Sequence, residues 1–414
     1  MGPDRRRVVV TGLGVISSIG TGVAEFAEGL RKGRSGARPI TAFDVTGFAH
    51  TTACEVVDFV PERWITRLKP DELGRATQLS VASAVLALGD AALTPEQLRD
   101  LRALIAVGTT YGESAELDRI VARQAATGSD GDDPGGVDPD AAAKSSSSRL
   151  SIDVARELEL TEAEAVTIPT ACAAGNYAIG YGFDAVADGE VDVALCGGVD
   201  ALLRMTFVTF YRLGTIAPKI CQPFDRDREG ILTGEGGAVL VLEDLDSALA
   251  RGAHVYAEIL GYGLACDAHH PVAPDQDSVA RCMTRAHANA GITAASVDYV
   301  SAHGTGTKAN DVTEAAAIRR VFDGDPPPVS SLKSMLGHAM GAASALAAAG
   351  CALALERGFM PPTINHVETD PEIGIDCVPN VARPADLRVV QNNSLAFAGN
   401  DAVLILGRHE GDAA

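Results

Sequence analysis

The sequence contains no Cys-x-x-Cys pair among its eight cysteines, although the chain is 414 residues long. This absence excludes the usual spacings of a zinc ribbon and of a dithiol redox motif. Positive charge is also scarce, because 34 Lys and Arg stand against 55 Asp and Glu and leave a net charge of −21. We therefore expect no nucleic-acid partner. Cysteines scattered through a long chain are typical of a reducing compartment, and we expect the protein to be cytoplasmic.

Long apolar runs are missing as well. The apolar part of SALAAAGCALALE, residues 344–356, is too short to cross a bilayer, and we expect no membrane partner. Glycines interrupt the run VVVTGLGVISSIG near the start, and no clean cleavage site of small residues follows, which argues against a signal peptide. The same run contains Gly-x-Gly but lacks the third glycine of a dinucleotide-binding fold. The segment CDAHH, residues 266–270, has no second ligand pair at matching spacing, so we expect it to line a site without binding a metal.

The chain repeats itself. Near-continuous Val, Ile and Leu strands alternate with helical patterns, which predicts buried sheets covered by helices. We expect an α/β protein of two similar halves, residues 1–250 and 251–414. Residues 127–148 fit no element, and their acidic, then small and polar composition predicts a surface excursion. Five segments of the first half resemble segments of the second half in the same order: residues 7–20 and 255–268, 104–112 and 297–307, 166–175 and 328–345, 193–200 and 394–401, and 236–244 and 401–409.

One thiol occupies an unusual place. In VTIPTACAAGNYAIGYG, residues 166–182, Cys172 follows an apolar run and precedes a helical pattern, with only small neighbours after it. A helix N-terminus favours the thiolate, and small neighbours let a substrate carbonyl approach. The repeat places Cys172 opposite the segment with Lys333 and His338, and it places His303 at the end of another strand. If the halves pack face to face, these groups share one cavity, as a nucleophilic thiol requires.

Each of these residues alone has a simpler interpretation. A lone cysteine in an apolar segment is usually part of the core, a strand-end histidine is often satisfied locally, and a lysine is usually solvated. Only their joint placement on matched segments favours catalysis.

Four segments resemble the elongating β-ketoacyl-acyl carrier protein synthases, the ketosynthases of fatty acid and type II polyketide assembly. They are TACAAG, PFDRDREGILTGEGGAVLVLE, AHGTGTKANDVTE and SLKSMLGHAMGAA, in the order of the family. The resemblance runs from RVVVTGLGVISSIG to NNSLAFAGND, which is nearly the whole chain. It implies the thiolase fold, in which two duplicated α/β halves form five layers, α-β-α-β-α.

The resemblance implies a role for each residue of these motifs. Cys172 would carry the acyl chain as a thioester. His303 and His338 would bind the malonyl thioester carbonyl and assist the loss of CO2. Lys333 would hold the charge pattern of the site, paired with Glu314.

The resemblance also implies contacts around the cysteine. The backbone N–H groups of Cys172 and Phe397 would form the oxyanion hole, and Phe397 would border the substrate. No cofactor is implied besides the phosphopantetheine arm, which the carrier protein brings. Four further side chains are expected to line the acyl pocket or the path of this arm: Tyr111, His270, Thr305 and Thr307.

The implied reaction is a decarboxylative Claisen condensation of the Cys-bound acyl chain with malonyl-acyl carrier protein. The implied partners are the carrier protein and a second subunit, which is either a copy of this chain or a ketosynthase-like protein. Carrier proteins of this family present an acidic helix. We expect the docking patch for it at Arg63, Arg67 and Lys69, with Arg212 as a weaker candidate.

Several positions depart from the family pattern. LAFAGND replaces an aromatic-Gly-Phe-Gly-Gly-Thr-Asn motif, and Val272 stands where threonine is common. Added Cβ atoms at Ala396 and Ala398 should restrict the backbone of a loop that gates the cysteine in the family. We therefore expect an unusual substrate range and a place in secondary metabolism, in a type II polyketide-like pathway.

Three rival functions were weighed against this one. A thiolase needs a second catalytic cysteine where this chain has AFAGND. A chain-length factor, the ketosynthase-like partner of a true synthase, loses the cysteine that this chain keeps, but the chain can be the catalytic subunit of such a heterodimer. An acyltransferase without condensation needs only the first half-reaction, and the presence of both histidines argues against it.

Overall fold

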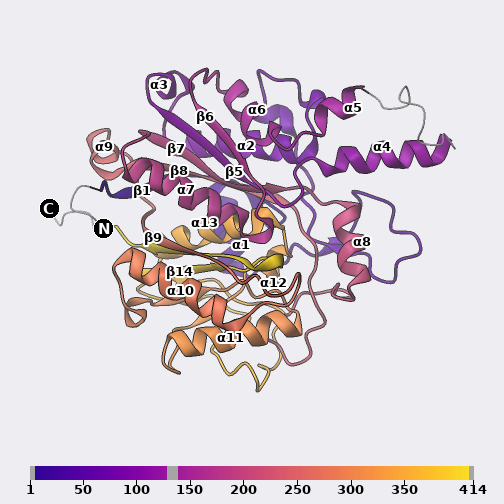
Figure 1. The fold of residues 1–414 in the computed structure, drawn as a ribbon, viewed down its shortest axis with the longest axis vertical. Helices are drawn as coiled ribbons and strands as arrows, with labels where there is room; N and C mark the ends of the chain where they lie inside the picture. The colour runs from indigo at the N-terminus through magenta and orange to yellow at the C-terminus, as the bar shows by residue number, and fades with distance from the viewer. Residues whose placement is uncertain (1–4, 128–138, 410–414) are drawn as a thin grey trace.

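The computed structural model describes residues 5–127 and 139–409. Figure 1 shows two layers of strands, with helices between them and on both outer sides. The predicted surface excursion at residues 127–148 lies partly outside the described residues. The prediction that this stretch fits no element is wrong for α5 (Pro139–Lys144), where a run of alanines favours a helix.

The strands follow the same order in the two halves. In the first half the order is β1 (Val8–Ser17), β8 (Gly236–Asp244), β7 (Val193–Asp200), β5 (Ala103–Gly108) and β6 (Glu164–Ile168). In the second half it is β9 (Ala257–Cys266), β15 (Asn400–Gly407), β14 (Val389–Ser394), β10 (Tyr299–Ser301) and β11 (Val329–Ser330). In each half the first three strands are antiparallel and the last three are parallel. The predicted duplication is therefore confirmed as a repeated topology.

The two half-sheets are hydrogen-bonded to each other. Val8–Val10 of β1 pair antiparallel with Ala257–Ile259 of β9, so the two half-sheets form one sheet of 11 described strands that includes the short β2 (Gly20–Thr21). The predicted boundary after residue 250 falls between α9 (Leu245–Ala250) and β9. We keep the division into residues 1–250 and 251–414 as a proposal, since the continuous sheet joins both parts.

One of the five sequence pairings is wrong. By its place in the sheet, β7 corresponds to β14, whereas the sequence comparison paired it with residues 394–401. Only Ser394 of that segment belongs to β14. The rest forms the 3-10 helix η6 (Phe397–Gly399) and the beginning of β15. The apolar residues of SLAFAGND have the composition of a strand, but several of them belong to a loop that lines a cavity.

Two buried helices form the middle layer. α7 (Ala174–Ala187) and α13 (Gly341–Arg357) pack against each other and against strands of both halves (Figure 1). The outer layers consist of α2 (Arg75–Asp90) and α6 (Arg149–Glu157) on the first half-sheet, and of α10 (Gln276–Ala290) and α11 (Lys308–Val321) on the second side. This is the five-layered arrangement that the sequence predicts.

The middle layer explains the most apolar run of the sequence. Every residue of α13 from Gly341 to Leu355 is buried, as expected for a helix that is apolar on all sides. Across residues 5–127 and 139–409, no helix combines the length and the apolar character needed to cross a membrane.

The Gly-x-Gly of β1 serves helix packing. A Cβ on Gly12 would lie 2.3 Å from Ala87 O, and one on Gly14 would lie 1.8 Å from Ser83 O, both on α2. The second half has the same close contact between a strand glycine and an outer helix, because a Cβ on Gly263 of β9 would lie 2.4 Å from the backbone of α10. The glycines therefore let an outer helix rest directly on the strand backbone.

The remaining described helices and strands connect or flank these layers. They are α1 (Gly22–Lys32), α3 (Pro95–Arg99), α4 (Ser114–Thr127), α8 (Arg204–Arg212) and α12 (Lys333–Leu336), with the strand pairs β3 (Arg38–Pro39) and β4 (Thr52–Ala53), and β12 (Phe359–Met360) and β13 (Arg383–Pro384).

Candidate active site

Cys172 lies at the N-terminal end of the central helix α7. It belongs to the 3-10 helix η4 (Ala171–Ala173), which begins with a positive φ of 51° at Ala171. The carbonyl of Cys172 accepts a hydrogen bond of 2.9 Å from Ser394 Oγ of β14. A Cβ on Gly175 would lie 2.7 Å from Ala345 N of α13, so only glycine lets the two central helices approach this closely. The turn that holds the thiol is thus fixed by both halves of the chain.

The thiol is held in its protonated form. Cys172 is 5% exposed, and burial raises its pKa to about 12. The positive charge of Lys333 and the backbone N–H groups of Cys172 and Phe397 oppose this shift, while the charge of Asp200 adds to it. The sequence led us to expect a thiolate at the helix N-terminus. Desolvation of the buried sulfur outweighs the helix field.

His303 follows β10 and is 4% exposed. Its backbone N–H and that of Gly304 each donate to one oxygen of Glu314, both at 2.8 Å. Lys333 Nζ donates to His303 O at 2.5 Å and lies 3.3 Å from Nδ1 of the same ring. Since an ammonium group can only donate, Nδ1 is the acceptor and Nε2 carries the ring proton.

His338 has the same tautomer for a different reason. Its Nδ1 accepts a hydrogen bond of 3.2 Å from Met340 N, which leaves the proton on Nε2. The rings of His303 and His338 lie 5.4 Å apart between centroids, at an interplanar angle of 82°. Burial and the charge of Lys333 hold the pKa of both imidazoles well below the usual range. Both rings are therefore neutral at neutral pH and offer one N–H donor each.

The predicted direct pairing of Lys333 with Glu314 does not form among the described residues. The Glu314 carboxylate is occupied by the N–H groups of His303 and Gly304 and by Asn393 Nδ2 at 3.1 Å. Burial lowers the pKa of Lys333, and the charge of Glu314 opposes this change. The two residues therefore bind different groups of His303: Lys333 contacts its ring and its carbonyl, and Glu314 accepts from its backbone N–H.

A single cavity of about 220 Å³ brings most of the predicted residues together. Thr305 and Thr307 lie along it with their hydroxyl oxygens 2.8 Å apart. Tyr111 is not among the residues that line this cavity, but the charge of Cys172 is one of the causes, after burial, that raise the pKa of its phenol, so its place beside the acyl chain stays a prediction. Predicted site residues in the lining are Cys172, His270, His303, Thr305, Thr307, His338 and Phe397, and apolar side chains include Phe210, Ile231, Val272 and Leu395.

The loop that departs from the family pattern lies over the cysteine. Ala398 N donates to Pro271 O at 2.8 Å, which ties this loop to the loop that carries His270. Ala398 has a positive φ of 61°, a conformation that a Cβ disfavours. Ala396 has an extended backbone with φ −127°, so the added Cβ at that position fits without strain. The expected restriction therefore applies at Ala398 and not at Ala396.

The predicted docking patch is partly neutralised. Arg67 forms an ion pair of 2.6 Å with Glu159, and Lys69 forms one of 2.8 Å with Glu72. Arg63 ends the short 3-10 helix η1 (Pro61–Arg63) and is exposed. Exposed ion pairs exchange partners at little cost, so the patch stays a prediction. Arg212, the weaker candidate, ends α8 next to Leu213, which lines the cavity.

Sequence reasoning missed a buried charge network behind the threonines. Asp311 accepts hydrogen bonds from Thr305 N at 3.0 Å and Gly306 N at 3.2 Å, and this holds the turn after His303. Arg228, whose side chain is 1% exposed, forms ion pairs with Asp311 at 3.5 Å and with Asp370 at 2.6 Å. Asp311 and Arg228 both lie in the quoted motifs, but nothing in the sequence indicates that their charges meet.

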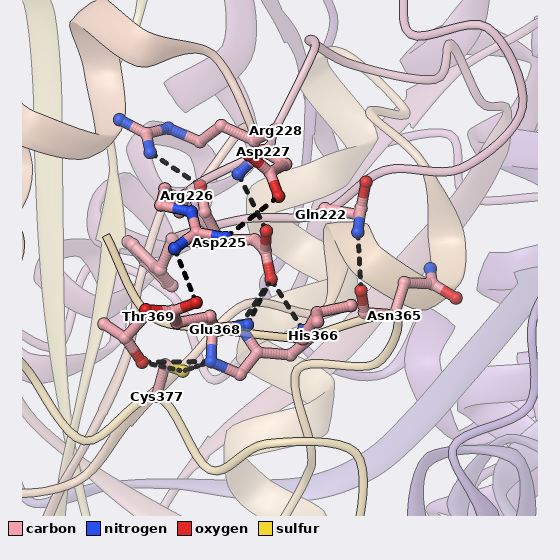
Figure 2. Close-up of polar contacts among 12 residues, drawn as sticks. Gln222, Asp225, Arg226, Asp227, Arg228, Asn365, His366, Glu368, Thr369 and Cys377 are labelled. Carbon is pink, nitrogen blue, oxygen red and sulfur yellow. Dashed lines mark hydrogen bonds and ion pairs between the residues drawn. The ribbon is translucent and has the colours of Figure 1, made fainter. Parts of the chain in front are cut away.

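Figure 2 shows how this network continues into the segment around His366. Asp225 Oδ2 accepts from Val367 N at 2.6 Å and from Glu368 N at 2.9 Å, and it lies 3.4 Å from His366 Nδ1. His366 Nε2 lies 3.5 Å from Cys377 Sγ. The order Cys-His-Asp resembles a catalytic triad, but Cys377 is 1% exposed and burial raises its pKa. The cluster serves to fasten the segment before Arg228 to the C-terminal part of the chain.

Comparison with known proteins identifies the family. The Beta-ketoacyl synthase N-terminal domain matches residues 5–248, and the Beta-ketoacyl synthase C-terminal domain matches residues 256–367. The tetracenomycin polyketide synthase ketoacyl synthase alpha subunit of Streptomyces glaucescens is 36% identical over 422 residues, which cover 97% of each chain. The protein therefore belongs to the β-ketoacyl synthase family, and it is a ketosynthase of the type II polyketide or fatty acid type.

Solved structures agree with this assignment. The ishigamide ketosynthase/chain length factor has a TM-score of 0.96 and 57% sequence identity, and the match covers 98% of this chain and 100% of that chain. AntDE:AntF, a type II polyketide synthase acyl-carrier protein in complex with its ketosynthase bound to the hexaketide, has a TM-score of 0.90 and 30% identity, with 98% and 100% coverage. The predicted thiolase-type fold is confirmed.

Proposed function

We propose that this protein condenses an acyl chain carried on Cys172 with malonyl-acyl carrier protein, with loss of CO2, and so forms β-ketoacyl-acyl carrier protein. One observation carries the proposal: a single cavity holds one thiol and two neutral imidazoles, each of which has its proton on Nε2. A thiol nucleophile suits acyl transfer, and a pair of neutral N–H donors suits an enolate.

The first step transfers the acyl chain. Cys172 Sγ attacks the thioester carbonyl of the acyl-carrier protein, the acyl group moves to Sγ, and the thiol proton ends on the departing pantetheine sulfur. The oxyanion that forms on the way needs donors close to the sulfur. The backbone N–H groups of Cys172 and Phe397 support this role, because both already act on Sγ and lower its pKa against the effect of burial.

The second step makes and uses a carbon nucleophile. When the malonyl group loses CO2, negative charge develops on its thioester oxygen, and the Nε2–H groups of His303 and His338 stabilise it. Lys333 keeps His303 in the required tautomer. The enolate carbon then attacks the Cys172 thioester, and Sγ leaves and regains a proton. One proton is therefore consumed for each CO2 released.

The carrier protein delivers both substrates through its phosphopantetheine arm. Thr305 and Thr307 present hydroxyl groups along the cavity, and His270 presents Nε2, because its Nδ1 accepts from Val272 N at 3.1 Å. We assign these three side chains to the arm. The carrier protein itself is proposed to dock at Arg63, Arg67 and Lys69.

Separate assays of the two steps test this function. His303→Ala and His338→Ala should each keep acylation of Cys172 but lower the rate of condensation about 100- to 1000-fold, as loss of one oxyanion donor does elsewhere. Intact-protein mass spectrometry with acyl-carrier protein reports the adduct, and CO2 release from malonyl-carrier protein reports the second step. Cys172→Ala is the control that abolishes the acyl adduct and, with it, the condensed product. Condensation near the wild-type rate in either histidine variant would refute the assigned roles.

A second proposal concerns the assembly. The ishigamide protein is described as a ketosynthase/chain length factor and is 57% identical to this chain. Because this chain keeps Cys172 and both histidines, we propose that it is the catalytic subunit of a comparable heterodimer in a secondary-metabolite pathway. A homodimer is the other outcome, and the two are separated by the experiment that closes the Discussion.

A further inference from the structure

Asp200 joins three segments around the cavity although it does not line it. It is the last residue of β7 and is 0% exposed. Its Oδ1 accepts hydrogen bonds from Thr109 Oγ1 at 2.8 Å and from Tyr111 N at 3.0 Å. Its Oδ2 accepts from Thr110 N at 2.8 Å and from Gly341 N at 2.6 Å. One carboxylate therefore fastens the turn after β5 to the start of α13.

The start of α13 is also the end of the turn that carries His338. Met340 donates to the His338 ring and has a positive φ of 50°. Gly341 follows directly, and a Cβ on it would lie 2.7 Å from Thr109 Cα and 2.8 Å from Asp200 Oδ2. The turn has no room to shift toward β5, and the hydrogen bond to Asp200 keeps it from moving away.

The hydrogen-bond donors around Asp200 favour the ionised form of its carboxyl group. All of its hydrogen-bond partners are donors, and the N-terminus of the long helix α13 favours a negative charge. Burial raises the pKa of Asp200 to about 6, against the lowering effect of these hydrogen bonds. The side chain is thus a carboxylate at neutral pH. After burial, its charge is the main group that raises the pKa of Cys172, and Lys333 acts in the opposite direction.

We propose that Asp200 is a positioning residue for condensation: its carboxylate fastens the turn between His338 and α13 to the turn after β5, and so holds the His338 imidazole in place. The inference rests on the proposed function, because it assigns His338 to the enolate. Asp200 acts only through its neighbours, since it lies outside the cavity lining.

The test uses the full-length chain and two readouts that should move in opposite directions. Asp200→Asn keeps the side-chain shape, removes the charge and places an NH2 group against two donors. We expect kcat with hexanoyl- and malonyl-carrier protein to fall about 10- to 100-fold, with KM for malonyl-carrier protein nearly unchanged. We also expect iodoacetamide to alkylate Cys172 of this variant at least about threefold faster than in the wild-type protein at neutral pH, since a lower thiol pKa raises the thiolate fraction. The mass of the Cys172 peptide measures this rate.

The other groups that face the sulfur stay in place in this variant. They are Lys333 of α12, the neutral rings of His303 and His338, and the backbone N–H of Phe397. Both imidazoles are already neutral at neutral pH, so a change in alkylation reports the loss of the Asp200 charge.

Thr109→Val is the matched control, because it removes one hydrogen bond to Asp200, together with the one that Gly112 N donates to Thr109 Oγ1 at 2.9 Å, and keeps the charge. It should slow condensation about two- to fivefold and leave alkylation of Cys172 unchanged. Unchanged condensation in Asp200→Asn, or slower alkylation together with slower condensation, would overturn the proposal. Circular dichroism shows whether Asp200→Asn folds. If it does not, Thr109→Val tests the proposal instead: slower condensation with unchanged alkylation supports positioning, and unchanged condensation overturns it. Failure of the proposed function is distinct, because wild-type protein would then release no CO2.

Discussion

Asp401 is a buried carboxyl at the beginning of β15, where the family resemblance implies asparagine. It is 2% exposed, and burial raises its pKa from 3.8 to about 8. A hydrogen bond of 3.4 Å from Ala396 N opposes the shift, and the charges of Asp267 and Glu314 add to it. The folded protein therefore keeps a proton that the unfolded chain releases near pH 4. Stability should fall as the pH rises from about 4 to about 8.

Asp401→Asn should remove this dependence. The amide oxygen still accepts from Ala396 N, and no charge has to be buried. We expect the Tm to rise about 2–5 °C at pH 8 and to change little at pH 4, which is close to the ordinary pKa of the unfolded carboxyl, so that little of the loss of stability has yet accumulated. Thermal melts across this pH range measure the effect. Asp325→Asn, on an exposed loop, is the control and should shift the Tm equally little at both pH values. A lower Tm for Asp401→Asn at pH 8 would mean that the carboxylate is a required acceptor.

The residues that carry charge show what a sequence can and cannot predict. Cys172, His303 and His338 were identified because motif and repeat placed them together. The partner of Lys333 was predicted wrongly, because the Glu314 carboxylate is already taken by backbone N–H groups that no motif reveals. Arg67 is predicted to bind the carrier protein, and nothing in the sequence indicates that Glu159 lies 2.6 Å away from it. Such pairings depend on side-chain positions that only the folded chain defines.

At the level of elements, the contact between α7 and α13 fixes the position of the nucleophile. Cys172 precedes α7 directly, and α13 begins just after His338. The helices meet without a side chain between them at Gly175, and the hydroxyl of Ser344 on α13 accepts a hydrogen bond of 3.2 Å from Asn176 N. A displacement of either helix would therefore change the distance between sulfur and imidazole.

Gly175→Ala should show this coupling. The new Cβ would lie 2.7 Å from Ala345 N and 2.7 Å from Ser344 Oγ, so the helices must separate. We expect destabilisation of about 1–3 kcal/mol and slower acylation of Cys172. Gly89→Ala in α2 is the matched control, because its Cβ meets nothing within 4 Å. That substitution should stabilise the protein by up to about 1 kcal/mol and leave acylation unchanged. Urea unfolding and the rate of the acyl adduct measure both effects; wild-type stability in Gly175→Ala would contradict the packing argument.

The elements themselves were predictable to different degrees. The strands of β1 and β8 followed from long Val and Leu runs, and the repeat gave their counterparts in the second half. The loop at residues 394–401 was misplaced, because Leu395 and Phe397 have strand-like composition but face the cavity. An apolar composition does not separate a buried strand from an apolar loop that lines an active site.

For the molecule as a whole, the sheet ends at β6, which leaves one backbone edge of the described sheet without a neighbouring strand. An open edge is a ready surface for pairing with another chain. Two apolar side chains flank this edge: Ile152 of α6 is 44% exposed, and Tyr181 of α7 is 40% exposed and reaches Glu164 of β6 at 2.6 Å. We expect the partner subunit to cover this edge.

Co-expression with a ketosynthase-like protein that lacks the cysteine tests both the surface and the type of assembly. A 1:1 heterodimer by native mass spectrometry would support the catalytic-subunit proposal, whereas a homodimer that excludes the partner would refute it. In either assembly, Ile152→Asp with Tyr181→Asp should weaken association at least about tenfold, because two charges would be buried against the partner. Leu249→Asp on α9 is the control, since Leu249 is 49% exposed and α9 packs on β1 and β8, whereas β6 is the last strand of the sheet. Dissociation by Leu249→Asp and not by the double variant would move the interface away from β6, to the surface formed by α9.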